Sequence, residues 1–98
     1  MVVVVKSVVG ACDTNAHGAV LRDLILDGLD RQQPMCLDFT GIFNATSSFV
    51  NTAFLEVVEQ RGFDAFKANV SLKNVNKQIA GLVRSRLSSF VSSDRRAA

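Results

Sequence analysis

The chain alternates between short apolar runs and longer segments in which apolar residues recur every three to four positions. The short runs are β-branched or alternate between apolar and polar positions, which predicts strands at residues 2–9, 35–40 and 69–73. The longer segments carry one apolar stripe with polar residues opposite, which predicts helices at residues 15–31, 46–61 and 74–92. The predicted order is therefore β-α-β-α-β-α.

Strands that alternate with helices favour an α/β fold with a small, mainly parallel or mixed sheet of three to four strands. The 98 residues fit a single domain, which we assign to residues 1–92, with residues 93–98 as a flexible C-terminal tail. The first strand is apolar on both faces and lies close to a sheet edge. We expect a homodimer through this strand, or a partner that covers it.

The composition is that of an ordinary globular domain, with 48% hydrophobic and 20% charged residues. The formal net charge of +2 is too small to indicate a nucleic-acid groove. Six basic residues lie in the last quarter: Lys73, Lys77, Arg84, Arg86, Arg95 and Arg96. Because the sequence places no aromatic platform beside them, we interpret them as a solvated helix face and do not expect nucleic acid as a partner.

The sequence also predicts where the protein works. The N-terminal apolar run is too short for a signal peptide, and no stretch approaches the ~20 apolar residues of a membrane span. We therefore expect a cytoplasmic protein with no membrane partner. Cys12 and Cys36 have neither a metal-site nor a redox-motif spacing, so no metal or cofactor is expected.

The chain lacks the residue sets that enzymes use. His17 is the only histidine and has no base or nucleophile partner in the sequence, and none of the common catalytic motifs is present. Asp38 is the only acid inside an apolar strand run. Its alternative role is a strand-end carboxylate that accepts hydrogen bonds from nearby backbone N–H groups. We therefore expect a protein without catalytic activity.

Residues 37–58 are the most informative segment, running from strand through turn to helix. Thr46, Ser47 and Ser48 stand at the predicted helix start. A hydroxyl from Thr46 or Ser47 can cap the helix by accepting a bond from a free backbone N–H. The same place favours a phosphate group, because the helix dipole stabilises its negative charge. Both interpretations remain open at this point.

This segment resembles the core motif of STAS domains of the anti-sigma factor antagonist type. Those proteins have a strand reading Leu-Asp-Leu-Ser, a short loop, and Asp-Ser-Ser-Gly at a helix start. Here residues 37–40 (LDFT) match the strand and residues 46–49 (TSSF) match the helix start. The segment is more similar still to the STAS-like family of small bacterial proteins, through the DF-x-GI and TSSF-x-N-x-AF patterns. Residues 72–76 (LKNVN) resemble that family's strand-to-helix turn.

The resemblance implies a non-enzymatic regulatory module that binds another protein through residues 43–49. The family's phosphorylated serine falls on Ser47, and the implied partner is a histidine-kinase-like ATPase. The candidate regulatory residues are Ser47 and Ser48, and the candidate partner-binding residues are Asp38, Asn44, Thr46 and Phe49.

Two positions depart from the STAS pattern and keep an alternative open. Thr46 replaces the acid before the serines, and Phe49 replaces the glycine after them. The chain is also shorter than a full STAS domain. These departures favour an interaction or inhibitor protein of the phage or mobile-element type, built on the same scaffold without a phosphorylation switch.

Overall fold

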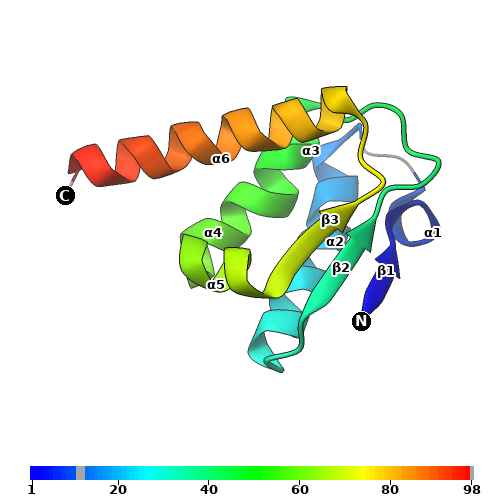
Figure 1. Cartoon of the computed structure of the whole chain (residues 1–98), viewed down its shortest axis with the longest axis horizontal. Helices are drawn as coiled ribbons and strands as arrows, with labels where there is room; N and C mark the ends of the chain where they lie inside the picture. The colour runs from blue at the N-terminus through cyan, green and yellow to red at the C-terminus, as the bar shows by residue number, and fades with distance from the viewer. Residues whose placement is uncertain (11–12, 98) are drawn as a thin grey trace.

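The computed structural model describes the backbone of residues 1–10 and 13–97 and the side chains of residues 1–10 and 13–89. Cys12 therefore lies outside the described residues. Three parallel strands form one sheet in the order β1-β2-β3, with β1 at Val2–Val4, β2 at Met35–Asp38 and β3 at Val70–Lys73 (Figure 1). The predicted α/β class with a small parallel sheet is confirmed.

The helices are more numerous than the sequence pattern predicts. They are α1 (Val5–Val9), α2 (Asn15–Asp30), α3 (Ser47–Val50), the π-helical turn η1 (Asn51–Leu55), α4 (Glu56–Arg61), α5 (Phe63–Asn69) and α6 (Lys77–Ala97). The segments α3, η1 and α4 follow one another without a break and correspond to the single helix expected at 46–61. Helix α6 ends at Ala97 and not at residue 92, whereas the flexibility of residues 93–98 stays a prediction.

The prediction of a strand over residues 2–9 is wrong beyond Val4. A strand needs a partner for its backbone groups, and β2 offers β1 a ladder of only three pairs, from Val2 with Cys36 to Val4 with Asp38. The chain therefore turns into helix α1, which buries Val5 completely and ends at Gly10, where φ is +77°. With only three residues, β1 is a short edge strand, and a homodimer through it stays a prediction.

One face of the sheet packs against the helices and forms the core. Alternate strand residues such as Val3, Met35 and Leu37 point into it and are almost fully buried. The core continues into three phenylalanines, whose rings meet edge to face: Phe49 with Phe54, and Phe54 with Phe66.

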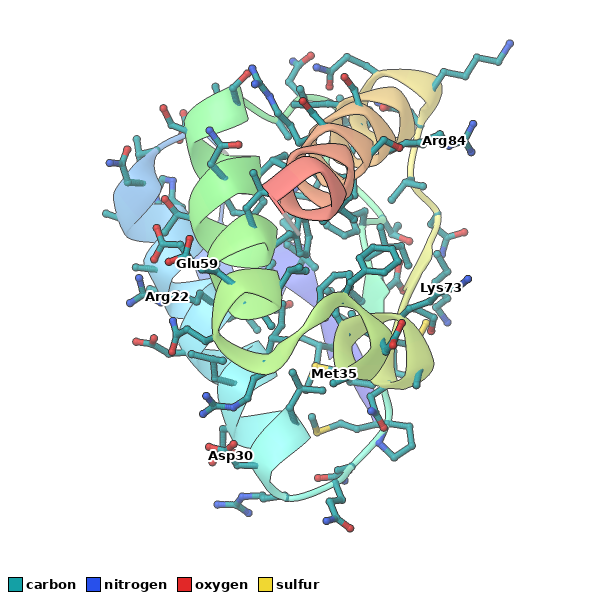
Figure 2. The ribbon with its side chains drawn as sticks, turned by 90° about the vertical axis from the view of Figure 1, so that its left-hand side faces the viewer. Arg22, Asp30, Met35, Glu59, Lys73 and Arg84 are labelled. Atoms are coloured by element: carbon teal, nitrogen blue, oxygen red, sulfur yellow. The ribbon has the colours of Figure 1, made fainter. Side chains whose placement is uncertain are left out.

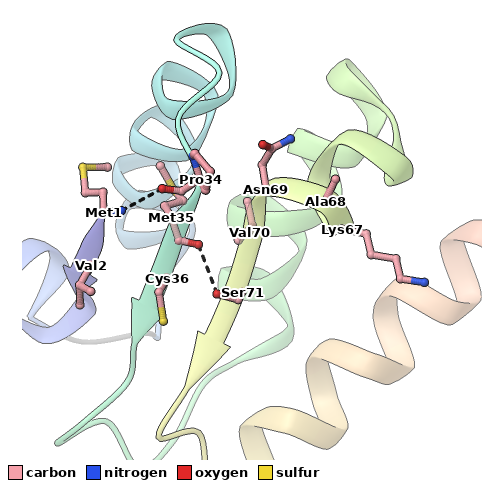
Figure 3. A pocket seen from close by; sticks show the side chains of 10 residues that line it. All are labelled: Met1, Val2, Pro34, Met35, Cys36, Lys67, Ala68, Asn69, Val70 and Ser71. Atoms are coloured by element: carbon pink, nitrogen blue, oxygen red, sulfur yellow. Dashed lines mark hydrogen bonds between the residues drawn. The ribbon is translucent and has the colours of Figure 1, made fainter.

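The opposite face of the sheet is open among the described residues. Val2 and Val4 are 58% and 42% exposed there. A shallow hollow of about 260 Å³ lies on this face beside Met1, Cys36 and Ser71, at the N-terminal ends of the strands (Figure 3). A parallel sheet usually has both faces covered, so this sheet is unusual in presenting one face to solvent.

Helices α2 and α3 approach each other closely near their N-terminal ends. Gly18, in the first turns of α2, packs directly against the backbone of Phe49 and the side chain of Thr52. Because both helices follow parallel strands, both start at the same edge of the sheet, where the carboxyl ends of β2 and β3 also lie. This edge carries the segment that the sequence singled out.

Candidate functional site

The candidate site is the loop between β2 and α3 together with the first turn of α3. It lies at the carboxyl end of the parallel sheet, which is the edge where open α/β sheets usually bind their ligands. Helix α6 begins beside this loop and shapes one side of it (Figure 1).

Asp38 closes the end of β2 by hydrogen bonds within the chain. Its carboxylate accepts from the Thr40 hydroxyl at 2.6 Å, from the Thr40 backbone N–H at 2.9 Å and from the Asn74 amide at 3.0 Å. These bonds lower the pKa of Asp38 to about 2, with the Thr40 hydroxyl as the largest cause. The geometry is that of the strand-end carboxylate considered from the sequence, and it joins the ends of β2 and β3.

Two side chains from the start of α6 hold the loop in place. Asn76 donates from its amide to the carbonyl oxygen of Phe43 at 2.6 Å, and its own carbonyl accepts from the N–H of Ile79. Gln78 makes a two-point contact with the backbone of Ala45, at 3.3 Å for each bond. The loop conformation is therefore fixed by side chains more than thirty residues away in the sequence.

Phe43 stands at the tip of this pinned loop and is 73% exposed. Its neighbours Ile42 and Ala45 are buried and anchor the loop on the core. A large aromatic side chain in water, on a loop that is already ordered, is the kind of group that anchors protein interfaces. Asn44 beside it is also exposed.

The first turn of α3 is capped as the sequence allowed. Thr46 is the N-cap, and its hydroxyl accepts from the backbone N–H of Phe49 at 3.2 Å. Ser47 is half-buried, and its hydroxyl oxygen accepts a hydrogen bond from the Arg86 guanidinium of α6 at 3.0 Å. Ser48 is exposed. Thr46, Ser47 and Ser48 thus lie together with Phe43 at one edge of the sheet.

Phe49 requires a correction, because it cannot contact a partner directly. Its side chain has no exposed surface and packs against Phe54 in the core. Position 49 points inward because it shares a helix face with the buried Ala53, one turn further along. The exposed aromatic of this segment is Phe43 instead.

The helix widens into a π-helical turn directly after this start. The turn covers Asn51–Leu55, and the side-chain oxygen of Asn51 is buried without a hydrogen-bond partner among the described residues. Asn51 follows Ser47 by one helical turn, so both lie on the face that α6 contacts. Single π-turns of this kind are frequent at functional sites.

Sequence reasoning included Phe43 in the docking segment 43–49 without singling it out, and it gave Asn76, Gln78 and Arg86 no role in this site. Phe43 lies among three phenylalanines within eleven residues, and neither its spacing nor its neighbours distinguish it from the buried Phe39 and Phe49. Gln78 has no signal in the sequence, because its contact with the loop depends on the position of α6 in the fold, and Asn76 is marked only as the last residue of the LKNVN segment. Only the LKNVN resemblance marked this strand-to-helix turn.

The described residues give no sign of a metal centre or a membrane span. No three His, Cys, Asp or Glu side chains come together there, and the His17 ring forms a hydrogen bond with Asp13 at 2.9 Å. Within the same residues, no helix combines the length and the apolar character needed to cross a bilayer.

A family model described as a STAS-like domain of unknown function (DUF4325) matches residues 17–80. The chain belongs to this STAS-like family. The matched range runs from the first turns of α2 to the first turn of α6, and it therefore contains the pinned loop, the Thr46 cap and both pinning residues. No curated protein and no solved structure matches the chain.

Proposed function

We propose that this STAS-like domain is a non-enzymatic regulatory module that docks a protein partner through residues 43–48. The observation that carries the proposal is Phe43, which is 73% exposed on a loop pinned by Asn76 and Gln78. Asn44 follows this anchor in the loop, Ser47 and Ser48 lie in the first turn of α3, and Asp38 and Thr46 fix the backbone on either side.

The pinned loop supports docking on energetic grounds. Full burial of an exposed phenylalanine contributes roughly 1.5–3 kcal/mol. Binding usually costs free energy when a mobile loop has to be ordered. Here the hydrogen bonds of Asn76 and Gln78 have ordered the loop before binding, so more of the gain from Phe43 remains as affinity.

Phosphorylation of Ser47 would regulate this docking surface. A phosphate there would lie at the start of a helix that continues to Arg61, and next to the Arg86 guanidinium that already contacts the Ser47 oxygen. It would add nearly two negative charges beside Phe43, which disfavours docking to an apolar or acidic surface. By the family resemblance, the partner is a histidine-kinase-like ATPase.

A second candidate is an interaction or inhibitor protein of the phage or mobile-element type without a phosphorylation switch. It is favoured by the state of Ser47, whose hydroxyl is half-buried and already bonded to Arg86. Thr46 in place of an acid also favours it. In this case Ser47 serves the helix start, and Phe43 remains the anchor.

Site-specific photo-crosslinking tests the proposal. A benzophenone amino acid replaces Phe43 in one variant and Gln60, which is exposed on α4, in a matched control. In lysate of the native host we expect one crosslinked protein from position 43 and none from position 60. Equal products from both positions, or none from either, contradict docking through this loop.

A Ser47→Asp change in the position-43 variant then separates the two candidates. Loss of the crosslink supports the phosphorylation switch, and an unchanged crosslink supports the inhibitor without a switch.

A further inference from the structure

The charges of this chain are strongly segregated along the sequence. Seven of the eleven Lys and Arg residues, but only one of the nine Asp and Glu residues, come after residue 66. The earlier part is acidic and pairs its three arginines internally: Arg22 with Glu56 at 2.8 Å, Arg61 with Asp30 at 3.0 Å, and Arg31 with Asp27 at 3.2 Å. The arginines on the acidic surface of α2 and α4 are therefore engaged with neighbouring carboxylates, and this surface keeps an excess of acidic residues.

The fold brings Lys73 and Arg84 onto one side of the molecule (Figure 2), Lys77 lies two helical turns before Arg84 on the same face of α6, and Lys67 projects from α5 toward α6 (Figure 3). We call Lys67 of α5, Lys73 of β3, and Lys77 and Arg84 of α6 the basic face. All four are exposed, and no ion pair among the described side chains includes any of them. Figure 2 shows Lys73 and Arg84 on the side opposite to Asp30 and Glu59.

The neighbouring charges do not cancel the basic face. Asp38 lies opposite Lys73 in the strand register, but its carboxylate is bonded to Thr40 and Asn74. Among the described side chains, Asp64 in the first turn of α5 is the other acid on these elements. Arg86 is not part of the face, because it points to Ser47. Four unpaired cations and one bordering acid therefore leave a net positive surface.

The three elements of the basic face carry no large exposed hydrophobic side chain of their own among the described residues, although Lys67 borders the hollow that Met1 and Val2 line. The exposed large hydrophobic side chains of the described residues are Met1, Val2, Val4, Val8, Val20 and Phe43, and none belongs to α5, β3 or α6. Protein interfaces need an apolar core, and helices that lie on membranes need an apolar face. Contacts to a phosphate backbone need neither.

Small polar side chains between the cations also suit a phosphate backbone. Ser85 and Ser88 on α6 are exposed, and hydroxyl groups commonly donate to phosphate oxygens, whereas the Ser71 hydroxyl already donates to the carbonyl oxygen of Met35. We propose that the basic face binds the sugar–phosphate backbone of duplex nucleic acid without reading its sequence. The sequence already clusters Lys73, Lys77 and Arg84, but only the fold adds Lys67 to them and turns Arg86 away to Ser47.

The expected binding is weak and strongly salt-dependent. Neutralising three to four phosphates gives a slope of roughly −3 for log K against log salt concentration, so affinity should fall about 50- to 100-fold between about 50 and 200 mM salt. A duplex should bind more tightly than a single strand, because its phosphate charge density is higher.

Fluorescence anisotropy with a labelled mixed-sequence duplex tests the proposal. The variant Lys73→Gln with Arg84→Gln removes two charges from the basic face. The control Arg31→Gln with Arg61→Gln removes two charges from the acidic surface, where exposed ion pairs contribute little to stability. We expect the first variant to halve the salt slope and to weaken binding roughly 10-fold or more at low salt, and the control to bind like wild type. Circular dichroism verifies that both variants are folded.

Several results would overturn the proposal. No duplex binding at low salt, or equal losses in both variants, would remove the basic face as a nucleic-acid surface. Tighter binding to the single strand than to the duplex would indicate base stacking, and Phe43→Ala would check whether Phe43 is the stacking residue. Tighter binding to polyglutamate than to the duplex would indicate that the partner is an acidic protein. The basic face is independent of the docking loop, so Phe43→Ala should leave duplex binding unchanged. Lys73→Gln with Arg84→Gln should likewise leave crosslinking from position 43 unchanged.

Discussion

Replacing Gly18 with alanine should destabilise the protein, although alanine is the better helix former. A Cβ atom at this position would lie 2.8 Å from the carbonyl oxygen of Phe49, 2.9 Å from the Cβ of Thr52 and 3.3 Å from the backbone nitrogen of Ala53. Two of these atoms are backbone and the third is attached to it, so none can swing aside. Helix α2 would have to move away from α3 and the π-helical turn.

The size of the effect follows from two opposing terms. Alanine gains about 1 kcal/mol over glycine in a helix interior through propensity alone. Forcing an extra carbon into a close-packed contact costs about 1–3 kcal/mol. We expect the steric term to win at Gly18, because helix backbones rather than side-chain tips have to shift, with a net loss of about 1–2 kcal/mol.

Two other helical glycines provide matched controls. A Cβ atom at Gly81 in α6 would meet nothing within 4 Å, so Gly81→Ala should stabilise by about 1 kcal/mol. A Cβ atom at Gly28 in α2 would meet the terminal methyl of Met35, which can change its rotamer. Gly28→Ala should therefore fall between the other two variants.

Urea unfolding followed by circular dichroism measures the series. Gly81→Ala and Gly18→Ala should differ by about 2–3 kcal/mol in the free energy of unfolding, and each 1 kcal/mol corresponds to roughly 4–8 °C in melting temperature. If Gly18→Ala is as stable as wild type or more stable, the close approach of α2 and α3 is not required by the fold. The position of the start of α3, and of the loop that precedes it, would then need another explanation.

Three further predictions concern the site. The pKa of Asp38 is lowered from its ordinary value of 3.8 to about 2, so its contribution to stability is present above pH 4 and is lost as the pH falls towards 2. The variant Asp38→Asn should flatten this decline in the free energy of unfolding, measured by urea titrations between pH 2 and 6. An unchanged decline would contradict the role of the Asp38 hydrogen bonds. Phe49→Ala should lower the free energy of unfolding by about 3–5 kcal/mol, whereas Phe43→Ala should change it by less than about 0.5 kcal/mol. Equal losses of stability in thermal unfolding would show that Phe43 is buried. Phosphoserine incorporated at position 47 should stabilise the domain by roughly 1 kcal/mol through Arg86, and this gain should disappear in Arg86→Ala. Differential scanning calorimetry compares wild type and Arg86→Ala, each with serine and with phosphoserine at position 47. An equal gain without the arginine would refute the pairing of the phosphate with Arg86.

The periodic pattern of apolar residues was sufficient to predict the long helices and strands and insufficient to predict the short ones. Helix α2 was predicted at 15–31 and spans Asn15–Asp30, because its apolar stripe is long enough to decide between helix and strand. Residues 5–9 also contain three valines, yet they form a helix because the neighbouring strand β2 ends. Helix α5 was not predicted at all, since its seven residues are too few to show a period.

The features of the candidate site also fall into those that the sequence predicts and those that it does not. The strand-to-helix segment, the cap at Thr46 and the hydrogen-bonding role of Asp38 could be read from local chemistry, because each depends on residues within a few positions. The exposure of Phe43 and the burial of Phe49 could not, because both are aromatic and both lie near the helix start.

The sequence by itself determined the α/β class, the family and the edge of the sheet at which the site lies, because these depend on periodicity and on short-range capping chemistry. Tertiary structure alone decided which side chains the site presents. Asn76, Gln78 and Arg86 reach the loop from about 33 to 39 residues away, and Lys67, Lys73, Lys77 and Arg84 share a face only after α5, β3 and α6 have packed. Contacts of this kind depend on where whole elements come to rest, and no local pattern in a single chain encodes that position.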